Sequence, residues 1–497
     1  MKQTMRFLSI AVLVAVGAMI LSCSKTEIDT EPQQEDNIIT LTTTVSFDNG
    51  TETRALTGTG AKTFAENETM AIVYKKTSGY TAMAVSAPLE STDIAEGGKS
   101  ATFSFALTSP DKKKDVTYIY PAAMAKPNFT VNYAALATQD GTLDNLAGNL
   151  DLATYTGAWN GASLPTGTLE NQLAILALTL KDSYDDSDLN STITGVTLSD
   201  GTNSYSVTRS AAAGPIYVAI KPTSSAAISV TATAGTTYYK KKLTGKTYAA
   251  SNGYSLSWRM MKAIPLASIT SPADLGKVIG ADGYAYYTAT AATAAGTTAS
   301  GIIAYVGSAG SVDESSSASA YKGLAIALTD ASNGSTFQWH DYTGGAAYYS
   351  SQTDAIGSAI NYKNGIANTT KMTNGNSSHT HAAATAAKNY STARPSGVSA
   401  WFLPSMGQWN LIVQGLATKK SGSTVSTNLT TSENSTYKSP NLNSVITDAG
   451  GTGLKFSNYW STTEYNGYYA WTMDFSFGKA LDLVKTKGYF VRAVFAF

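Results

Sequence analysis

Histidine, cysteine and acidic side chains are the groups in this sequence that could carry out catalysis or bind a metal, and the histidines are few. His379 and His381 are two residues apart, so in a strand they would share one face and could begin a metal site. The small polar residues 374–378 before them favour a surface loop instead. His340 is followed by Asp341, but neighbouring strand residues point to opposite faces, which argues against a catalytic pair. We expect no metal site, no cofactor and no catalytic residue.

Other patterns of catalysis and ligand binding are missing from the sequence. No Gly-x-x-x-x-Gly-Lys-Ser/Thr pattern follows a strand, so a phosphate loop is not expected. No Glu-Pro-Asn or Gln-Pro-Asp tripeptide supports a calcium-dependent sugar site. Two carboxylates in a cleft, as in glycoside hydrolysis, remain an alternative because Asp and Glu are plentiful, but no motif supports them. We therefore expect a protein that is not an enzyme.

Cys23 is the only cysteine, so a disulfide within one molecule is excluded. It follows an apolar run, residues 7–21, that is preceded by basic residues and is too short to span a bilayer, which is the anatomy of an export signal. The sequence Ile-Leu-Ser-Cys resembles a bacterial lipoprotein box, which implies cleavage before Cys23, diacylation of its thiol with palmitate-type chains, and anchoring in the outer membrane. The alternative is a buried structural thiol. The predicted segments are a lipoprotein signal peptide, 1–22, and a tether, 23–37.

Composition and charge exclude one class of partner. The chain has 35 basic and 35 acidic residues, so nothing indicates nucleic-acid binding. Charged residues make up only 14%, and Thr, Ser, Ala, Gly and Tyr are abundant, which favours strands and turns. The length of 497 residues indicates roughly three domains.

The first element that could position a functional segment is a strand over residues 39–47, where apolar and polar side chains alternate. Asp-Asn-Gly at 48–50 then predicts a turn. One face of the strand carries Ile39, Leu41, Thr43, Val45 and Phe47.

Further short apolar runs predict two β-rich regions and a separate third one. Five of the seven tryptophans and all three histidines lie after residue 263. The expected strands cover 69–74, 101–107, 116–121, 172–180, 193–198, 216–220, 228–232 and 238–243. The expected domains are an N-terminal β-sandwich, 38–160, a second β-sandwich, 161–262, and a C-terminal recognition domain, 263–497.

Three passages resemble the fimbrillin-like lipoproteins of Bacteroides-type bacteria: residues 116–121 (Val-Thr-Tyr-Ile-Tyr-Pro), 168–181 and 242–256. The resemblance covers roughly residues 24–260. It implies two transthyretin-like β-sandwich domains in a mainly β chain, and assembly into pili by strand exchange.

Strand exchange requires a removable strand, a cut site and a groove that the cut leaves unsatisfied. Residues 39–47 are the candidate strand, and Arg54-Ala55 matches the family's processing position for an arginine-specific protease. Loss of the strand would expose backbone donors and acceptors above an apolar core, which only another strand can satisfy. The alternative is that Arg54 is an ordinary loop arginine and the strand stays in place.

The third region resembles a domain found at the C-termini of many secreted Bacteroides proteins, which is α+β and distantly C-type-lectin-like. Its Leu-Pro-Ser-x-x-Gln-Trp element also resembles sulfatase-modifying-factor domains, whose activity depends on cysteines that this region lacks. The resemblance implies a recognition module. The motifs lie at 274–283, 323–328, 401–409, 459–464 and 491–493.

Exposed aromatic residues are the best candidates for ligand binding, because Tyr and Trp can stack on sugar faces or anchor an interface. Tyr465, Tyr468 and Tyr469 lie in a Gly- and Asn-containing turn segment, as do Tyr348 and Tyr349 in another. Partial burial in strands is their alternative. Two further expectations are structural: a core position for Trp401, Trp409, Trp460 and Trp471, and an ion pair of Arg492 with Glu464.

The end of the sequence, residues 488–497, matches the last strand of the C-terminal domain and so leaves no spare donor strand. We therefore expect a tip fimbrillin, outermost in a fimbria, that binds host, bacterial or glycan surfaces and joins other fimbrial subunits by strand exchange. The alternative is a stationary outer-membrane lipoprotein that binds glycans or proteins without polymerising.

Overall fold

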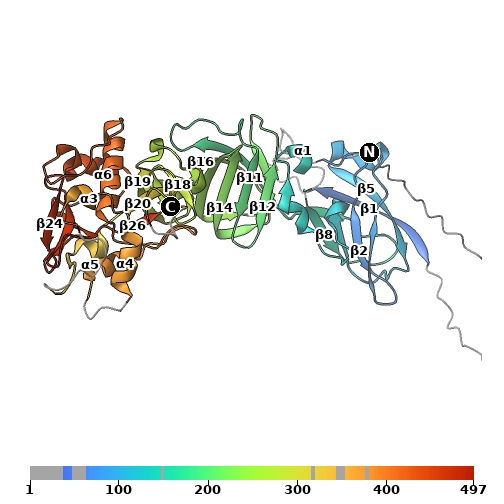
Figure 1. The fold of residues 1–497 in the computed structure, drawn as a ribbon. Helices are drawn as coiled ribbons and strands as arrows, with labels where there is room; N and C mark the ends of the chain where they lie inside the picture. Colours follow the sequence, from blue (N-terminus) through green and yellow to red (C-terminus); the bar gives the residue numbers. More distant parts are fainter. Residues whose placement is uncertain are drawn as a thin grey trace, which may run out of the picture.

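The computed structural model describes residues 37–47, 63–146, 150, 152–314, 320–342, 353–374 and 380–497. Figure 1 shows three units in a row, two of them built of strands and the third of strands and helices. The expectation of a mainly β chain with helices in its C-terminal part is confirmed. Among the described residues, no helix is both long and apolar enough to cross a membrane.

The first unit is one eight-stranded sheet, in the order β3-β2-β6-β8-β9-β1-β5-β4, that folds over on itself. Its two halves face each other, since Phe105 of β5 stacks on Tyr118 of β6 with ring centroids 6.3 Å apart. A sandwich therefore forms from one continuous sheet. Its strands are β1 (Ile38–Phe47), β2 (Ala71–Lys75), β3 (Thr81–Val85), β4 (Ile94–Ala95), β5 (Ser100–Thr108), β6 (Val116–Tyr120), β8 (Ala153–Gly157) and β9 (Gly167–Asn171).

The boundary between the first two units differs from the sequence boundary at residue 160. β9 pairs with β8 and β1, so the first sheet extends to Asn171. In the other direction, β7 (Thr138–Gln139) pairs with β12 of the second unit, and Leu136 and Leu146 belong to that unit's core. The two units therefore interlock. The sequence boundary was misplaced because strand pairing decides to which unit β7 and β9 belong, and the local sequence pattern does not reveal that pairing.

The second unit is built on β10 (Ala174–Asp182), a run whose continuous apolar character predicts burial on both faces or a place in a sandwich core. Ala177 and Thr179 are only half-buried, so β10 is covered more fully on one face than on the other. It lies between β13 and β16, and its residues Ala174, Leu176, Leu178 and Leu180 are buried. The other elements are α1 (Leu143–Asn145), β11 (Gly195–Ser199), β12 (Ser204–Thr208), β13 (Ile216–Ile220), β14 (Thr223–Ala234), β15 (Thr237–Tyr248) and β16 (Gly253–Pro265).

β16 connects the second unit to the third. Its first part pairs in parallel with β10, and its last residues, Ile264 and Pro265, pair with β18 of the C-terminal unit. An ion pair strengthens this junction: Lys240 Nζ lies 2.6 Å from Asp282 Oδ2, which also accepts a hydrogen bond from the Tyr286 hydroxyl. The sheet is therefore continuous across the junction (Figure 1).

In the third unit, helices cover an extension of that sheet. α6 (Met406–Ser421) packs on β19, and Gly415 permits the approach because a Cβ there would lie 1.8 Å from the Ala304 carbonyl oxygen. Trp401, Trp409, Trp460 and Trp471 are buried, as expected. The remaining elements are β17 (Val278–Gly280), β18 (Tyr284–Tyr286), α2 (Ala289–Ala295), β19 (Ala299–Val306), β20 (Gly323–Ala327), β21 (Phe337–Gln338), α3 (Ile356–Ala359), α4 (Gly365–Thr373), α5 (Ala382–Lys388), α7 (Ser439–Asp448), β22 (Asn458–Glu464), β23 (Tyr469–Asp474), β24 (Lys479–Val484), β25 (Gly488–Tyr489) and β26 (Val494–Ala496).

Candidate functional site

β1 is the predicted removable strand, and the structure places it inside the first sheet. The alternation in its sequence becomes an alternation in burial: Thr43, Val45 and Phe47 are buried, whereas Thr42 and Thr44 between and before them are exposed. The side chains that face inwards thus fill the core of the first unit.

The two long sides of β1 are paired to different extents. On one side it is antiparallel to β5 along almost its whole length, from Ile38 opposite Thr108 to Ser46 opposite Ser100. On the other side only Val45–Phe47 pairs, in parallel, with the start of β9. Within the described part of the chain, residues 38–44 have no strand on that second side. The C-terminal end of β1 is therefore the more firmly held.

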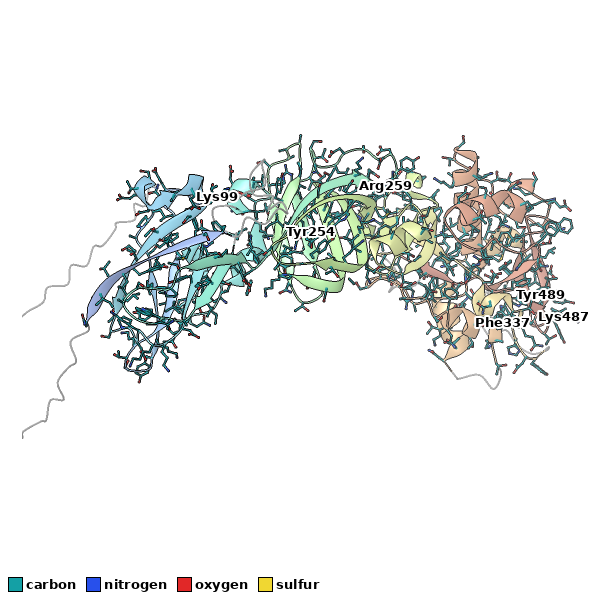
Figure 2. All side chains as sticks on the ribbon, turned by 180° about the vertical axis from the view of Figure 1, so that it is seen from behind. Lys99, Tyr254, Arg259, Phe337, Lys487 and Tyr489 are labelled. Atoms are coloured by element: carbon teal, nitrogen blue, oxygen red, sulfur yellow. The ribbon has the colours of Figure 1, made fainter. Side chains whose placement is uncertain are left out.

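Aromatic contacts add to the hold on this end. The Phe47 ring is stacked on Phe64, with centroids 4.3 Å apart, and meets Tyr120 edge-on at 5.5 Å. Burial of a side chain of this size contributes about 2 kcal/mol. The Phe47 backbone N–H also donates to the Lys99 carbonyl, at 3.2 Å; Lys99 is labelled on the first unit in Figure 2.

A polar contact holds the middle of β1 in the core. The buried Thr43 hydroxyl donates to the Pro165 carbonyl oxygen at 2.7 Å, and the Tyr118 hydroxyl donates to the same oxygen at 2.7 Å. Burial raises the pKa of Tyr118 to about 12, because the apolar surroundings disfavour its anion. If Thr43 left its place, the Pro165 carbonyl would lose one of these two hydrogen bonds and keep the one from Tyr118.

Taken together, these contacts define what loss of β1 would leave behind. β5 would lose its partner along Ser100–Thr108, and β9 would lose its partner at Gly167–Leu169. Between the two strands the core would be open where Val45 and Phe47 had lain. Only a second strand with alternating apolar side chains can satisfy both the backbone groups and the core.

The predicted processing and lipidation positions lie beyond what the structure describes. Arg54 and Ala55 fall within 48–62, and Cys23, with the predicted signal peptide and nearly all of the tether, falls within 1–36. On the sequence, Arg54 separates β1 from Phe64, the first buried residue of the part of the chain described after the gap.

The last residues of the sequence lie inside the third unit. β26 (Val494–Ala496) is antiparallel to β20, and Phe497 forms backbone hydrogen bonds with Gly323 in both directions, each 3.0 Å. Gly323 is needed there, since a Cβ would come within 2.2 Å of the Phe497 ring. Figure 1 shows this end on the side of the unit that faces the second unit.

The histidines lie in the third unit, and one expectation about them was wrong. His381 is not on a surface loop but is 1% exposed, where its Nδ1–H donates to the Trp339 carbonyl oxygen, 3.3 Å away. Its ring lies 4.8 Å from that of His340. Burial, and next the charge of His340, lower the pKa of His381 to about 4. Among the described residues, no group of three or more His, Cys, Asp or Glu side chains could hold a metal ion.

The expected ion pair of Arg492 with Glu464 was also wrong. Arg492 is fully buried and its Nε lies 2.7 Å from Asp330 Oδ1, while Glu464 pairs at 2.6 Å with Lys485. Burial lowers the pKa of Lys485, and the charge of Glu464 opposes this effect. Asp330 and Glu464 are both buried and both have a cationic partner. The sequence does not show which cation belongs to which carboxylate, because each pair joins segments that are distant in the sequence.

The predicted tyrosines occupy the hairpin between β22 and β23. Tyr468 is 54% exposed, whereas Tyr465 is half-buried and packs edge-on against Trp471 with centroids 5.3 Å apart. Tyr469 is half-buried too, and its backbone carbonyl accepts a hydrogen bond from Tyr465. Tyr468 is thus the most accessible of the three. Tyr348 and Tyr349 lie outside the described residues.

Comparisons with known proteins give likenesses in structure only. No family model matches the chain, and no curated protein matches it significantly. A fimbrial protein from Bacteroides ovatus is 14% identical, with a TM-score of 0.32, covering 93% of this chain and 100% of the other. A fimbrial assembly protein from Parabacteroides distasonis is 10% identical, with a TM-score of 0.27, covering 46% of this chain and 95% of the other. Likenesses this distant do not establish a function.

Proposed function

We propose that this chain is a cell-surface adhesion subunit of a fimbria, positioned at its tip and joined to the next subunit by strand exchange at the place of β1. The observation that carries the proposal is the position of β1. It fills a slot between β5 and β9 with side chains of alternating burial. A strand from another subunit with the same alternation would meet the same backbone groups and the same core.

The tip position is supported by the use of β26 within its own unit. A subunit in the shaft of such a fibre must also lend a strand to its neighbour. β26 is hydrogen-bonded to β20 on one side, and the Phe497 ring next to it is 6% exposed. Release of this segment would open the core of the third unit, so it is poorly suited to donation.

The linear arrangement of the units also supports a tip position, with the third unit pointing away from the rest of the fimbria. The slot is in the first unit, and the third unit lies at the opposite end of the row (Figure 1). The second unit is joined to both by shared sheet and core. We assign the recognition of host, bacterial or glycan surfaces to the third unit, with Tyr465, Tyr468 and Tyr469 as candidate contacts and no catalytic role.

Two further steps belong to the proposal. Cys23 carries the lipid that holds the precursor in the outer membrane, and cleavage between Arg54 and Ala55 separates β1 and the anchor from the rest of the chain. Phe64 and the core residues that follow it in the sequence stay with the larger product, whereas Val45 and Phe47 leave with β1.

Immunogold electron microscopy of the producing bacterium, with antibodies against the third unit, tests the proposal. Wild-type protein should label the ends of filaments, and Arg54→Ala protein should stay on the membrane at its uncleaved mass. Arg259→Ala, at an exposed position of the second unit, is the matched control and should behave as wild type. Label along the whole filament would contradict the tip position, and normal assembly of Arg54→Ala would contradict the processing step.

The same experiment separates the proposal from its alternative, a stationary outer-membrane lipoprotein that binds glycans or proteins without polymerising. In that case the wild-type chain keeps residues 23–54, and the label covers the membrane without filaments.

A further inference from the structure

A polar groove of about 850 Å³ lies on the third unit between the short helix η9 (Ala331–Gly334) and α5. This volume is in the range of small-molecule sites in proteins. Phe337, one of the lining residues, is labelled in Figure 2 beside Tyr489, its partner across β21 and β25. The hydroxyl and amide groups of the lining include those of Thr329, Ser332, Asn333, Thr385, Asn389 and Tyr390.

Neutral groups that both donate and accept hydrogen bonds dominate this lining. Asp330 is its one charged residue, and its carboxylate already accepts hydrogen bonds from Arg492, at 2.7 Å, and from the Tyr459 hydroxyl, at 3.0 Å. A second groove of the same unit contrasts with it, since Lys277, Lys419 and Lys420 line that one. The lining of the groove between η9 and α5 thus offers no cation to an anionic ligand, and the charge of its one acid, Asp330, is already paired with that of Arg492.

Two small and two aromatic residues shape the groove. Ala382 and Ala386 on α5 leave space above the helix, and both are half-buried. Phe337 and Tyr390 are half-buried as well, so part of each ring is accessible to a ligand. Aromatic faces of this kind bind the C–H faces of sugar rings.

The walls of the groove are held in place before any ligand arrives. The Tyr390 hydroxyl and the Thr329 hydroxyl are 2.7 Å apart, and the Tyr390 ring packs edge-on against Trp401 with centroids 4.8 Å apart. On the opposite wall, Ser332 and Asn333 have φ angles of 47° and 57°, a left-handed conformation that side-chain-bearing residues adopt at a cost. A preformed site loses less entropy on binding.

From this combination we propose that the groove binds a neutral oligosaccharide. Its hydroxyls pair with the hydroxyl and amide groups of the lining, and a ring face lies on Phe337 or Tyr390. The inference rests on the proposed function, which makes the third unit the recognition end, and it names the chemical class of the ligand and the site. The groove is distinct from the hairpin of Tyr468, none of whose residues line it.

The test uses the full-length chain, because β16 ties the third unit to the second. The chain is applied to an array of neutral gluco-, galacto-, manno- and xylo-oligosaccharides beside sialylated and sulfated glycans, and the best neutral binder is titrated by calorimetry. Thr385→Trp, from an exposed position on α5, should fill the groove and lower the affinity by about tenfold or more. Asn389→Ala should weaken binding several-fold. Thr424→Ala, at an exposed position away from the groove, should leave it unchanged.

Three results would overturn the inference: no binding of any neutral oligosaccharide, binding of acidic glycans only, or wild-type affinity in both Thr385→Trp and Asn389→Ala. If Tyr468→Ala abolishes binding while both groove variants bind normally, the ligand lies on the hairpin. In that case the recognition role stands and the groove does not. Failure of strand exchange is a separate result, since none of these substitutions touches β1.

Discussion

The ring of Phe47 lies stacked on the ring of Phe64, with 4.3 Å between their centroids and 26° between their planes. The two residues stand on either side of the segment 48–62, which contains Arg54. A cut at Arg54 would leave this contact intact but turn it from a contact within one chain into a contact between two. The strand could then leave without breaking a further covalent bond.

Phe47→Ala is expected to destabilise the first unit by about 3 kcal/mol, because it removes a buried ring from a packed aromatic cluster. Scanning calorimetry of the whole chain would measure the loss. Thr42→Ala, on the exposed face of the same strand, is the matched control and should change stability by less than about 0.5 kcal/mol. Equal effects of the two substitutions would show that the inward face of β1 does not fill the core.

Alkali should weaken the first unit through Tyr118. Its pKa is raised to about 12 by burial, so the folded state keeps the proton longer than the unfolded state, in which the pKa is about 10. The contribution of the neutral Tyr118 hydroxyl to the free energy of unfolding is fully present below pH 10 and is lost as the pH rises through 12. Urea unfolding measured between pH 9 and 12 should show this loss in the wild type and a smaller one in Tyr118→Phe. Parallel pH profiles for the two proteins would contradict the assignment.

Acid should weaken the third unit through His381. Its pKa is lowered to about 4 by burial and by His340, so the unfolded state, with a pKa near 6.5, takes up a proton first. The stability of the neutral form is present above pH 6.5 and is lost as the pH falls through 4. His381→Gln should flatten this part of the profile, as measured by thermal melting between pH 7 and 4. If the His381 imidazole signal, identified by its absence from His381→Gln, titrates near pH 6.5 in the folded chain, the prediction is wrong.

Arg492→Lys should destabilise the third unit by about 3 kcal/mol or more. Arg492 is fully buried, and its guanidinium bonds Asp330 as well as the carbonyls of Ala327 and Thr452, a set of directions that an ammonium group cannot match. Arg259→Lys is the control, since Arg259 pairs with Asp186 at the surface of the second unit (Figure 2) and its loss should cost little. Calorimetry measures the melting temperatures of the two variants. If Arg492→Lys melts at a temperature similar to that of Arg259→Lys, the structural role of Arg492 is refuted.

The sequence identifies those strands in which buried and exposed side chains follow the distribution of apolar and polar residues. β1 was expected over 39–47 and forms over Ile38–Phe47, and the run at 216–220 coincides with β13. β16 was different, because its pattern does not reveal that it leaves one unit and enters the next. Its two ends find partners in β10 and β18, and only the assembled sheet determines where the unit ends.

For the candidate sites, the sequence reveals the residue types but not their partners. It identified Arg492 as a buried cation that needs an acid, yet its partner Asp330 lies 162 residues away and could not be distinguished from Glu464. It placed His381 in a loop because of the polar residues before it, although the ring packs against Trp339. The groove between η9 and α5 was not expected at all, since no local signal joins these two segments.

Amide hydrogen exchange along β5 tests the central claim most directly. In the uncut chain, Ser100–Thr108 should be protected by β1. After cleavage at Arg54 and removal of the released segment, β5 should exchange quickly while β6 stays protected. A synthetic peptide with the sequence of Ile38–Phe47 should then restore protection, and the same peptide with Val45→Asp should not. If protection is lost throughout the first unit and the peptide does not restore it, β1 is a permanent part of the fold and the account of strand exchange is wrong.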